Sequence, residues 1–476
     1  MSMRSVFITG ATGVMGRASL EAILARGDCR VRLLVRGSKK NLKAMRRYEG
    51  KNVEIFTGDL LDRASVERAL GDADIVLHMG GLVSPMADRY PEKTMKVNVE
   101  GTRNVVDAVL KRPDAAHVRF VYIGSVAQMP SRMEPNHWGR TGDPLMPSEF
   151  DFYGLSKILA ERVVVESGLE KWVSLRQSGI LHPGLFTRGS NPITFHVPLR
   201  GVLEWATVED SGRLMAALCG DDVPESFWRN FYNIGSGESY RLSNYEFEKL
   251  ILGAVGSPAP ERIFEPNWFA TRNFHGCWYL DSDRLEELVP FRANVPVERY
   301  FRQMVRKAPW WTRLAPLAPA PLVKRMMRRV ALTPDEGTLD WIGRDDCEDK
   351  IKAFFGSRGE REAIPGWEDF DLSRPSENPR LLSHGYDETK EDAELSINDC
   401  REAAVFRGGK CLSKSMAQGN LSEKLEWECA RGHRFHASPA LILKGGHWCP
   451  DCMPAPWRTS EEATLNPFYA QVYEED

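Results

Sequence analysis

The chain has 476 residues, a hydrophobic fraction of 42% and a formal net charge of −3. This length predicts two or three domains, and the composition is that of a globular protein with an ample core. The charge balance excludes a general attraction to nucleic acid or anionic membrane. No apolar stretch of about 18 residues is present, so we expect no membrane-spanning helix, and no secretory signal precedes the first strand.

Up to about residue 177, short apolar segments alternate with segments of helical spacing. The expected strands are residues 5–10, 31–36, 53–58, 74–80, 119–125 and 172–179, and the expected helices include 17–26, 64–70 and 99–110. This alternation predicts an α/β fold, a Rossmann-type doubly wound parallel sheet with helices on both faces. The irregular residues 178–306 predict a smaller substrate-binding lobe, which completes a domain over residues 1–306.

The first expected strand runs into glycines spaced as Gly10-x-x-Gly13-x-x-Gly16. In a doubly wound sheet, Gly10 would allow the tight turn and Gly13 the close approach of a dinucleotide pyrophosphate. Gly16 would let the following helix pack against the strand, and the N–H groups at the start of that helix would bind the anion. An ordinary glycine-rich turn is the alternative.

Tyr153 and Lys157 stand four residues apart in a strongly helical segment, so they share one helix face. The lysine charge is expected to lower the pKa of the tyrosine toward neutrality. Such a phenol can exchange a proton with a carbonyl or alcohol oxygen while a hydride moves at carbon. Ser125 closes the strand 119–125 at the sheet edge where ligands bind, and it could hydrogen-bond the same oxygen.

Several ordered motifs carry a family resemblance: residues 9–16, 58–60, 78–81, 97–105, 122–125 and 153–157, with a further aspartate-containing segment at 205–214. Together they resemble the extended short-chain dehydrogenases/reductases, which include the NAD-dependent epimerases and dehydratases. The resemblance implies that Ser125, Tyr153 and Lys157 form the catalytic triad. For Asn98, a structural role at a helix start is expected rather than catalysis.

The cofactor site follows partly from the resemblance, which implies that Asp59 and Leu60 border the adenine. It also implies that Val14 and Met15 offer N–H groups to the pyrophosphate, and that Gly80 and Gly81 line the ribose side. The expected cofactor-binding residues are Gly10, Thr12, Gly13, Val14, Met15, Gly16, Arg36, Lys39, Asp59, Leu60, Gly80, Gly81, Tyr153 and Lys157.

The end of the second expected strand favours NADP over NAD. A carboxylate at this place would accept from the ribose hydroxyls of NAD, but here the sequence is basic, with Arg36, Lys39 and Lys40. A guanidinium suits a 2′-phosphate, so NADP(H) is predicted, with NAD as the alternative cofactor. A merely basic surface loop is the competing interpretation.

Departures from the family pattern favour a reductase. No Asp-Glu pair follows Ser125, where Val126 and Ala127 stand, so the acid–base pair of sugar-nucleotide dehydratases is missing. Gln177 and Ser178 replace the asparagine usual in epimerases, and the segment looks closer to the hydroxysteroid dehydrogenase/ketoreductase branch. The expected pocket wall is apolar: Met79, Leu82, Val83, Met86, Met129, Trp138, Leu181, Phe186, Phe195 and Trp205.

The predicted function is therefore NADP(H)-dependent oxidation or reduction of a bulky, mostly apolar small molecule, with tyrosine as acid and base. Two alternatives remain open at this point. One is an NAD(P)-dependent sugar-nucleotide epimerase, and the other is a non-catalytic nucleotide-binding or regulatory protein. The intact residues Ser125, Tyr153 and Lys157 argue against the second alternative.

Residues 307–394 are expected to form a basic Trp/Pro-rich connector and a helical linker. The part 307–333 carries six Lys/Arg, no Asp/Glu, and Trp310 and Trp311. It is interpreted as a connector that packs on the main domain or as a peripheral membrane segment. The sequence that follows predicts one helix over 334–355, started by a cap at Thr333.

The terminal module, residues 395–476, carries a cysteine and histidine pattern. Cys429, His433, Cys449 and Cys452 suit tetrahedral Zn²⁺ in a closed structural site, with Cys411 as an alternative ligand to His433. The stretch resembles zinc-ribbon or treble-clef segments. Nine Lys/Arg against eleven Asp/Glu after Ser396 argue against nucleic acid as a partner. The module is expected to close over the reductase or to mediate self-association as a homodimer.

Four further cysteines, Cys29, Cys219, Cys277 and Cys347, are scattered singly along the chain. Isolated thiols of this kind suit a reducing compartment, so a cytoplasmic location is expected.

Overall fold

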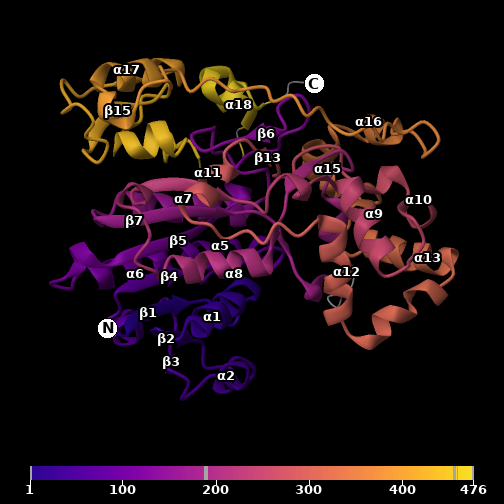
Figure 1. The fold of residues 1–476 in the computed structure, drawn as a ribbon. Coiled ribbons are helices and arrows are strands. Elements are labelled where there is room, and N and C mark those ends of the chain that lie inside the picture. The colour runs from indigo at the N-terminus through magenta and orange to yellow at the C-terminus, as the bar shows by residue number, and fades with distance from the viewer. Residues whose placement is uncertain (1–2, 187–190, 454–456, 458, 474–476) are drawn as a thin grey trace.

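A computed structural model describes residues 3–186, 191–453, 457 and 459–473. Its centre is a parallel sheet with the strand order β3-β2-β1-β4-β5-β7-β11 (Figure 1). The strands are β1 Arg4–Thr9, β2 Cys29–Val35, β3 Val53–Thr57, β4 Ile75–His78, β5 Arg119–Ser125, β7 Lys171–Gln177 and β11 Asn230–Ile234. The sequence predicts the first six; β11 lies in the irregular segment, and its short, half-polar sequence does not indicate a strand. The predicted Rossmann-type sheet is confirmed.

Helices cover both faces of the sheet. On one face α1 (Val14–Arg26) packs against α8 (Val208–Ala217), and on the other α6 (Gly101–Leu110) packs between α3 (Arg63–Leu70) and α7 (Phe152–Val165). The short helix α2 (Lys39–Arg46) follows β2, and a π-helix (Lys96–Glu100) leads into α6. A separate hydrophobic cluster fills the space on each face, as expected for strands buried on both sides.

A second lobe lies beside the carboxyl ends of the strands (Figure 1). Its helices are α9 Asn244–Ala254, α10 Pro260–Ile263, α12 Val297–Lys307, a 3-10 helix Trp310–Leu317, α13 Ala320–Ala331, α14 Thr338–Ile342, α15 Glu348–Phe355 and α16 Arg358–Glu362. Two small sheets accompany it: β8 Ile180–Leu181 pairs with β10 Ala206–Thr207, and β9 Val202–Glu204 pairs with β12 Arg241–Ser243. In the described residues, no helix combines the length and hydropathy that crossing a bilayer requires.

The single helix predicted over residues 334–355 is wrong. That stretch forms α14, a short 3-10 turn and α15, and the first of these is interrupted at Gly343. Thr333 does not cap a following helix; its hydroxyl donates to the carbonyl of Val330 at 2.7 Å and so closes the end of α13. The Thr-Pro signature fits either role, and here the helix before it takes the hydroxyl.

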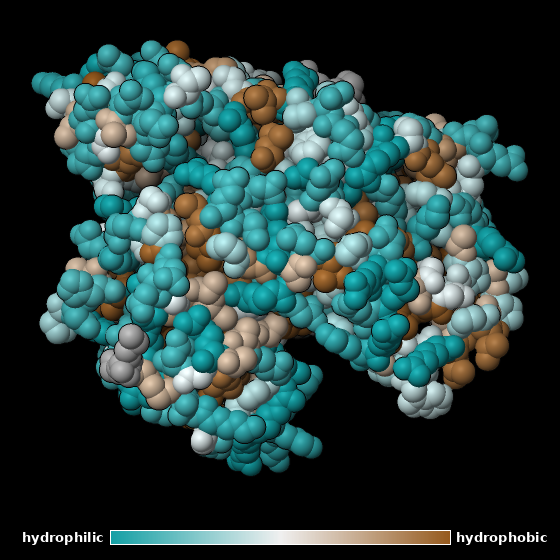
Figure 2. All heavy atoms as spheres, viewed as in Figure 1, coloured by the Kyte–Doolittle hydropathy of each residue, from teal (hydrophilic) through white to brown (hydrophobic). Residues whose placement is uncertain are grey.

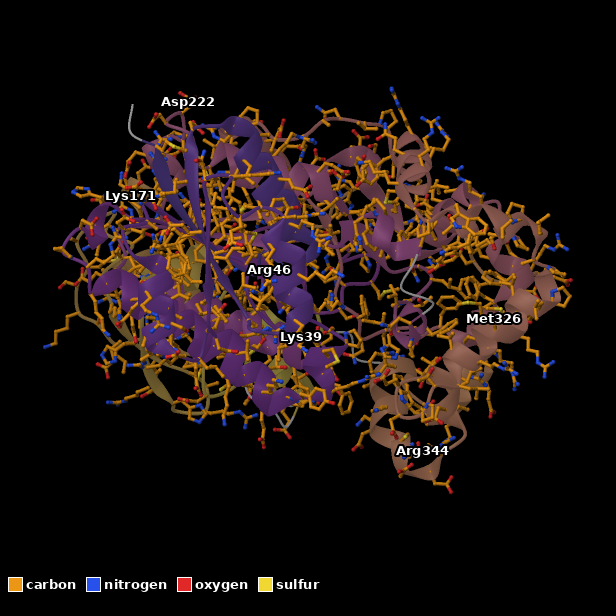
Figure 3. The ribbon with its side chains drawn as sticks, turned by 90° about the horizontal axis from the view of Figure 1, so that it is seen from below. Lys39, Arg46, Lys171, Asp222, Met326 and Arg344 are labelled. Carbon is orange, nitrogen blue, oxygen red and sulfur yellow. The ribbon has the colours of Figure 1, made fainter. Side chains whose placement is uncertain are left out.

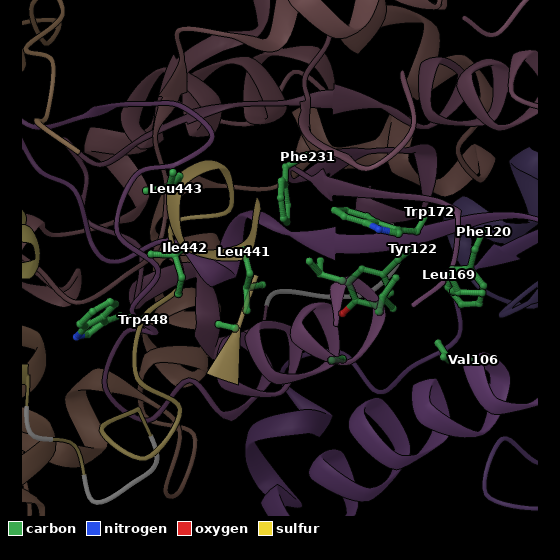
Figure 4. Packing of buried hydrophobic residues seen from close by; sticks show 14 of the residues in the cluster. Val106, Phe120, Tyr122, Leu169, Trp172, Phe231, Leu441, Ile442, Leu443 and Trp448 are labelled. Atoms are coloured by element: carbon green, nitrogen blue, oxygen red, sulfur yellow. The ribbon is translucent and has the colours of Figure 1, made fainter. Parts of the chain in front are cut away.

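The C-terminal module lies along the β7–β11 edge of the sheet, over α7 (Figure 1). It contains α17 Ile397–Phe406, the antiparallel strands β14 Lys410–Cys411, β15 Leu425–Glu428 and β16 Arg434–Ala437, a π-helix Ala440–Lys444, α18 Thr459–Leu465 and α19 Pro467–Ala470. Leu441 and Ile442 of the π-helix belong to the same buried cluster as Trp172 and Phe231 of the sheet (Figure 4). The module and the sheet therefore share one continuous core.

A buried charge cluster also fastens the module to α7. Glu161, one turn after Lys157, binds Arg176 of β7 at 2.8 Å and His447 of the module at 2.7 Å, and all three side chains are buried. Burial alone would raise the pKa of Glu161, but the charge of Arg176 and the hydrogen bond from His447 outweigh it and lower that pKa. The helix that carries Tyr153 is thus held from both sides.

Replacing Glu161 with glutamine should lower the free energy of unfolding by about 3–5 kcal/mol, because it leaves Arg176 buried without a counter-charge. Chemical denaturation at neutral pH measures this. The depressed pKa means that the stabilisation is present above the ordinary pKa of 4.5 and fades as the pH falls below it. Wild type and variant should therefore converge in acid. Glu67→Gln, which breaks the exposed pair with Lys111, is the control and should change stability by less than about 1 kcal/mol.

Candidate active site and metal site

The glycine turn after β1 has the predicted geometry. Gly10 has a φ of +78°, and a Cβ there would lie 2.8 Å from the backbone of Met79. A Cβ on Gly16 would lie 2.2 Å from the carbonyl oxygen of Gly10, so the helix can approach the strand only with glycine at this position. Helix α1 begins directly after Gly13, which has no side chain to cap it. Its first N–H groups are therefore available to an anion.

A cavity of about 730 Å³ opens at the carboxyl ends of β1, β2, β4, β5 and β7. It lies across the point where the strand order reverses, between β1 and β4, which is where open α/β sheets bind ligands. The expected cofactor residues that line it are Gly10, Thr12, Gly13, Val14, Met15, Gly16, Arg36, Asp59, Leu60, Gly80, Gly81, Tyr153 and Lys157. Lys39 is the exception, because it begins α2 beyond the end of β2 and is not part of this lining.

Ser125 is fixed at the end of β5 by a reciprocal cap. Its hydroxyl accepts from the amide of Ala127 at 3.2 Å, and its own amide donates to the side chain of Gln128 at 2.7 Å. The Ser125 hydroxyl lies close enough to the Tyr153 phenol to lower its pKa. The structure thus brings the serine and the tyrosine together on the wall of the cavity, as the sequence predicts.

The electrostatics of the pair Tyr153 and Lys157 differ from the expectation. Burial raises the pKa of Tyr153 to about 12, although the neighbouring hydroxyl of Ser125 acts to lower it. Burial lowers the pKa of Lys157 to about 7, against the charge of Glu161. The ammonium donates to the carbonyl of Ile123 and lies 4.6 Å from the ring centre of Tyr122. The expected lowering of the Tyr153 pKa by Lys157 is therefore wrong for this arrangement, because removal from water dominates both groups.

A polar network supports the floor of the cavity. The hydroxyl of Thr9 contacts His78 at 2.8 Å and accepts from the amide of Gly80 at 2.9 Å. His78 also contacts Thr102 at 2.9 Å, and burial lowers its pKa to about 3, so it is neutral. The sequence does not predict this role of His78. The only indication is that a polar residue ends an otherwise apolar strand.

Asn98 has a structural role, but not at the start of a helix as expected, because it lies inside the π-helix Lys96–Glu100. Its amide oxygen accepts from the backbone of Leu82 at 2.7 Å, and its amide nitrogen donates to the carbonyl of the same residue at 3.0 Å. It also donates to the hydroxyl of Ser156 on α7 at 2.8 Å. Asn98 therefore ties the loop after β4 to the helix that carries the catalytic residues.

A second chamber of about 770 Å³ adjoins the first. The two share wall residues, including Val126, Trp205 and His275, and so lie side by side. The far walls are mainly apolar side chains of α9, α10 and α13: Phe247, Ile251, Leu252, Val255, Ile263, Val323, Met326, Met327 and Val330. Glu248 also lines it; burial raises the pKa of this carboxyl to about 7.

Half of the residues predicted for the apolar pocket wall line the two chambers. Met79, Leu82, Val83, Phe186 and Trp205 line the two chambers. Met129, Trp138, Leu181 and Phe195 are instead fully buried in separate core clusters, and Met86 is exposed. Hydrophobicity alone does not separate a residue that lines a cavity from one that fills the core.

The C-terminal cluster has the spacing of a metal site. The ligand atoms of Cys429, His433, Cys449 and Cys452 all lie within 4.8 Å of one another. Cys429 and Cys452 are 3.8 Å apart at sulfur, and Nδ1 of His433 is 3.5 and 3.4 Å from the sulfurs of Cys449 and Cys452. Zinc–ligand bonds of about 2.3 Å to sulfur and about 2.0 Å to nitrogen in a tetrahedron give ligand separations of about 3.8 and 3.5 Å. Cys411 lies outside the group, so His433 is the fourth member.

Residues 6–181 match the family model described as "NAD dependent epimerase/dehydratase family". This part of the chain is therefore similar to that family. Its members are enzymes of the extended short-chain dehydrogenase/reductase type, as the motifs predict.

Individual relatives show the same similarity. The low-salt glycan biosynthesis protein Agl12 of Haloferax volcanii is 29% identical over 53% of this chain and 82% of its own length. The 3 beta-hydroxysteroid dehydrogenase type 7 of Rattus norvegicus is 31% identical over 38% of this chain and 54% of its own. The chain spans about half the length of most of the first curated relatives that it matches.

Among solved structures, the UDP-Glc/GlcNAc 4-epimerase of Campylobacter jejuni shares the fold, with a TM-score of 0.51 and 16% identity. The similarity covers 64% of this chain and 98% of that one.

Proposed function

We propose that this protein is an NADP(H)-dependent oxidoreductase that reduces a carbonyl, or oxidises an alcohol, on a bulky apolar molecule. The observation that carries the proposal is the apolar chamber that adjoins the cofactor cavity. A nucleotide sugar would place a charged diphosphate and a polar ring in this space. An apolar substrate would instead gain from leaving water.

The residues at the junction of the two chambers fit such a reaction. A nicotinamide dinucleotide in the first chamber would be held by the α1 turn, Asp59 and Leu60, and would supply or accept the hydride. With a pKa of about 12, Tyr153 is protonated at neutral pH and suited to donate a proton to a carbonyl oxygen. Ser125 would orient that oxygen, so the arrangement favours carbonyl reduction.

A substrate panel tests the proposal. Purified protein should oxidise NADPH with hydrophobic ketones and show no turnover of UDP-sugars. The family also contains sugar-nucleotide enzymes, so UDP-glucose is the informative competitor. Turnover of UDP-sugars without turnover of any ketone would reverse the assignment in favour of an epimerase.

The preference for NADPH rests on Arg36, which lines the cavity at the end of β2. Replacing Arg36 with alanine should raise the Kd for NADPH about tenfold or more, because a charge-assisted contact to the 2′-phosphate is lost. The Kd for NADH should stay the same. Fluorescence titration of both cofactors measures the two values.

Arg46→Ala is the matched control, because Arg46 lies at the far end of α2 and is not part of the cavity lining (Figure 3). It should leave both constants within a factor of about two of wild type. If wild type binds NADH as tightly as NADPH, the preference is overturned.

We also propose that the C-terminal group binds one structural zinc ion. The shell of three thiolates and one imidazole is complete, so it leaves no open position for catalysis. The absence of a disulfide among the nine cysteines, all of them in the described residues, supports a reducing, cytoplasmic location.

A further inference from the structure

The 3-10 helix Trp310–Leu317 and helix α13 form an exposed apolar edge of the second lobe. Trp310 is 72% exposed and Leu317 is 77% exposed. Trp311, Leu314 and Leu322 are also exposed, which is unusual for so many large apolar side chains within 13 residues. Figure 2 shows brown, hydrophobic side chains on this lower right corner of the molecule. We define this surface, residues 310–329, as the Trp/Arg surface.

The same surface carries unpaired positive charge. Arg313, Arg325, Arg328 and Arg329 are exposed, and within the described parts of the chain none of them forms an ion pair with a carboxylate. Residues 307–333 contain no Asp or Glu to offset them. On α13, Arg325 and Arg329 stand one turn apart, beside Leu322 and Met326. Surfaces that enter the headgroup region of an anionic bilayer typically combine tryptophan and leucine with arginine.

The opposite face of α13 is part of the substrate chamber. Val323, Met327 and Val330 point inward and line it. Met326 lies between the two faces: it is 57% exposed and also lines the chamber. Figure 3 shows Met326 on the outer side of this lobe. Met326 is therefore the side chain that separates the chamber from the Trp/Arg surface.

We propose that the Trp/Arg surface docks on an anionic lipid bilayer and that the chamber opens toward that bilayer past Met326. The second half of this inference rests on the proposed function, since only an apolar substrate would use such a route. A second copy of the chain is a poorer occupant, because a two-fold interface would place two sets of four arginines against each other. The anionic headgroups complement that charge.

Vesicle flotation without substrate tests the docking. The full-length protein should float with vesicles of phosphatidylcholine and 30% phosphatidylserine, and binding should fall about tenfold or more with phosphatidylcholine alone or in 0.5 M NaCl. Two variants probe the two components: Trp310→Ala with Leu317→Ala, and Arg325→Gln with Arg329→Gln. Each should reduce binding about tenfold or more. None of these four residues lines the chamber, so turnover of a dissolved ketone should be unchanged.

Leu381→Ala is the matched control, because Leu381 is 64% exposed outside this surface. It should float like wild type. The docking proposal is overturned if wild-type protein remains at the bottom of the gradient and does not float with the vesicles. It is also overturned if the Leu381→Ala control loses as much vesicle binding as the variants. A different result would assign the surface to a second copy of the chain: wild type does not float but self-associates, and the Trp310→Ala/Leu317→Ala variant does not self-associate. Flotation without ketone turnover would overturn the proposed function and leave the docking intact.

Discussion

Tyr153→Phe is expected to lower kcat for ketone reduction about 10³-fold, because the phenol is the proton donor to the carbonyl oxygen. The substitution removes a single oxygen atom, and the ring still fills its place beside the cavity. The Kd for NADPH should therefore change little. Steady-state turnover and fluorescence titration of the same preparation separate the two effects.

Tyr90→Phe serves as the control for this variant, because Tyr90 is 53% exposed and does not line the cofactor cavity. Its kcat should equal that of wild type. Turnover by Tyr153→Phe within a factor of about two of wild type would remove the tyrosine from the chemistry. That result would favour the alternative in which the chain is a nucleotide-binding regulatory protein.

The sequence predicts the positions of Ser125, Tyr153 and Lys157 well because each follows from local pattern. Ser125 ends an apolar strand, and Tyr153 and Lys157 share one helix face. The charge state of these groups is a different matter. The pKa of Tyr153 depends on how much water the surrounding chambers exclude, and residues from distant parts of the chain, such as Phe274 and His275, form those walls. No local pattern carries that information.

The sequence offers packing of the C-terminal module on the reductase as one of two expectations, but it does not predict the contacts that attach the module. Glu161 and His447 are 286 residues apart, yet they meet in the core at 2.7 Å. Arg162 of the same helix donates to the carbonyl of Trp448 at 3.1 Å, and Glu166 accepts from the hydroxyl of Ser438 at 2.7 Å. From the sequence these charged residues indicate only a solvated helix face. In the folded chain the C-terminal module covers these side chains, and their hydrogen bonds attach the module to α7.

These contacts make the metal site matter to the catalytic helix. Cys449→Ser should lower the midpoint of thermal unfolding by about 10 °C or more, since a structural zinc site contributes several kcal/mol and the module shares its core with the sheet. Loss of zinc should also reduce kcat, because His447 and Trp448 directly precede Cys449 and contact α7. Elemental analysis of wild type should give about one zinc per chain.

The matched control is Cys411→Ser, which removes a half-buried thiol of the same module from outside the ligand group. It should retain zinc and unfold within a few degrees of wild type. A strong chelator should lower the unfolding midpoint of wild-type protein as much as the Cys449→Ser substitution does. It should not lower the midpoint of the Cys449→Ser variant any further. Suppose instead that wild-type protein contains no zinc and unfolds at the same temperature with and without chelator. The module would then be held in place by its hydrophobic core alone. In that case the Glu161 cluster, rather than a metal ion, would fix the position of α7.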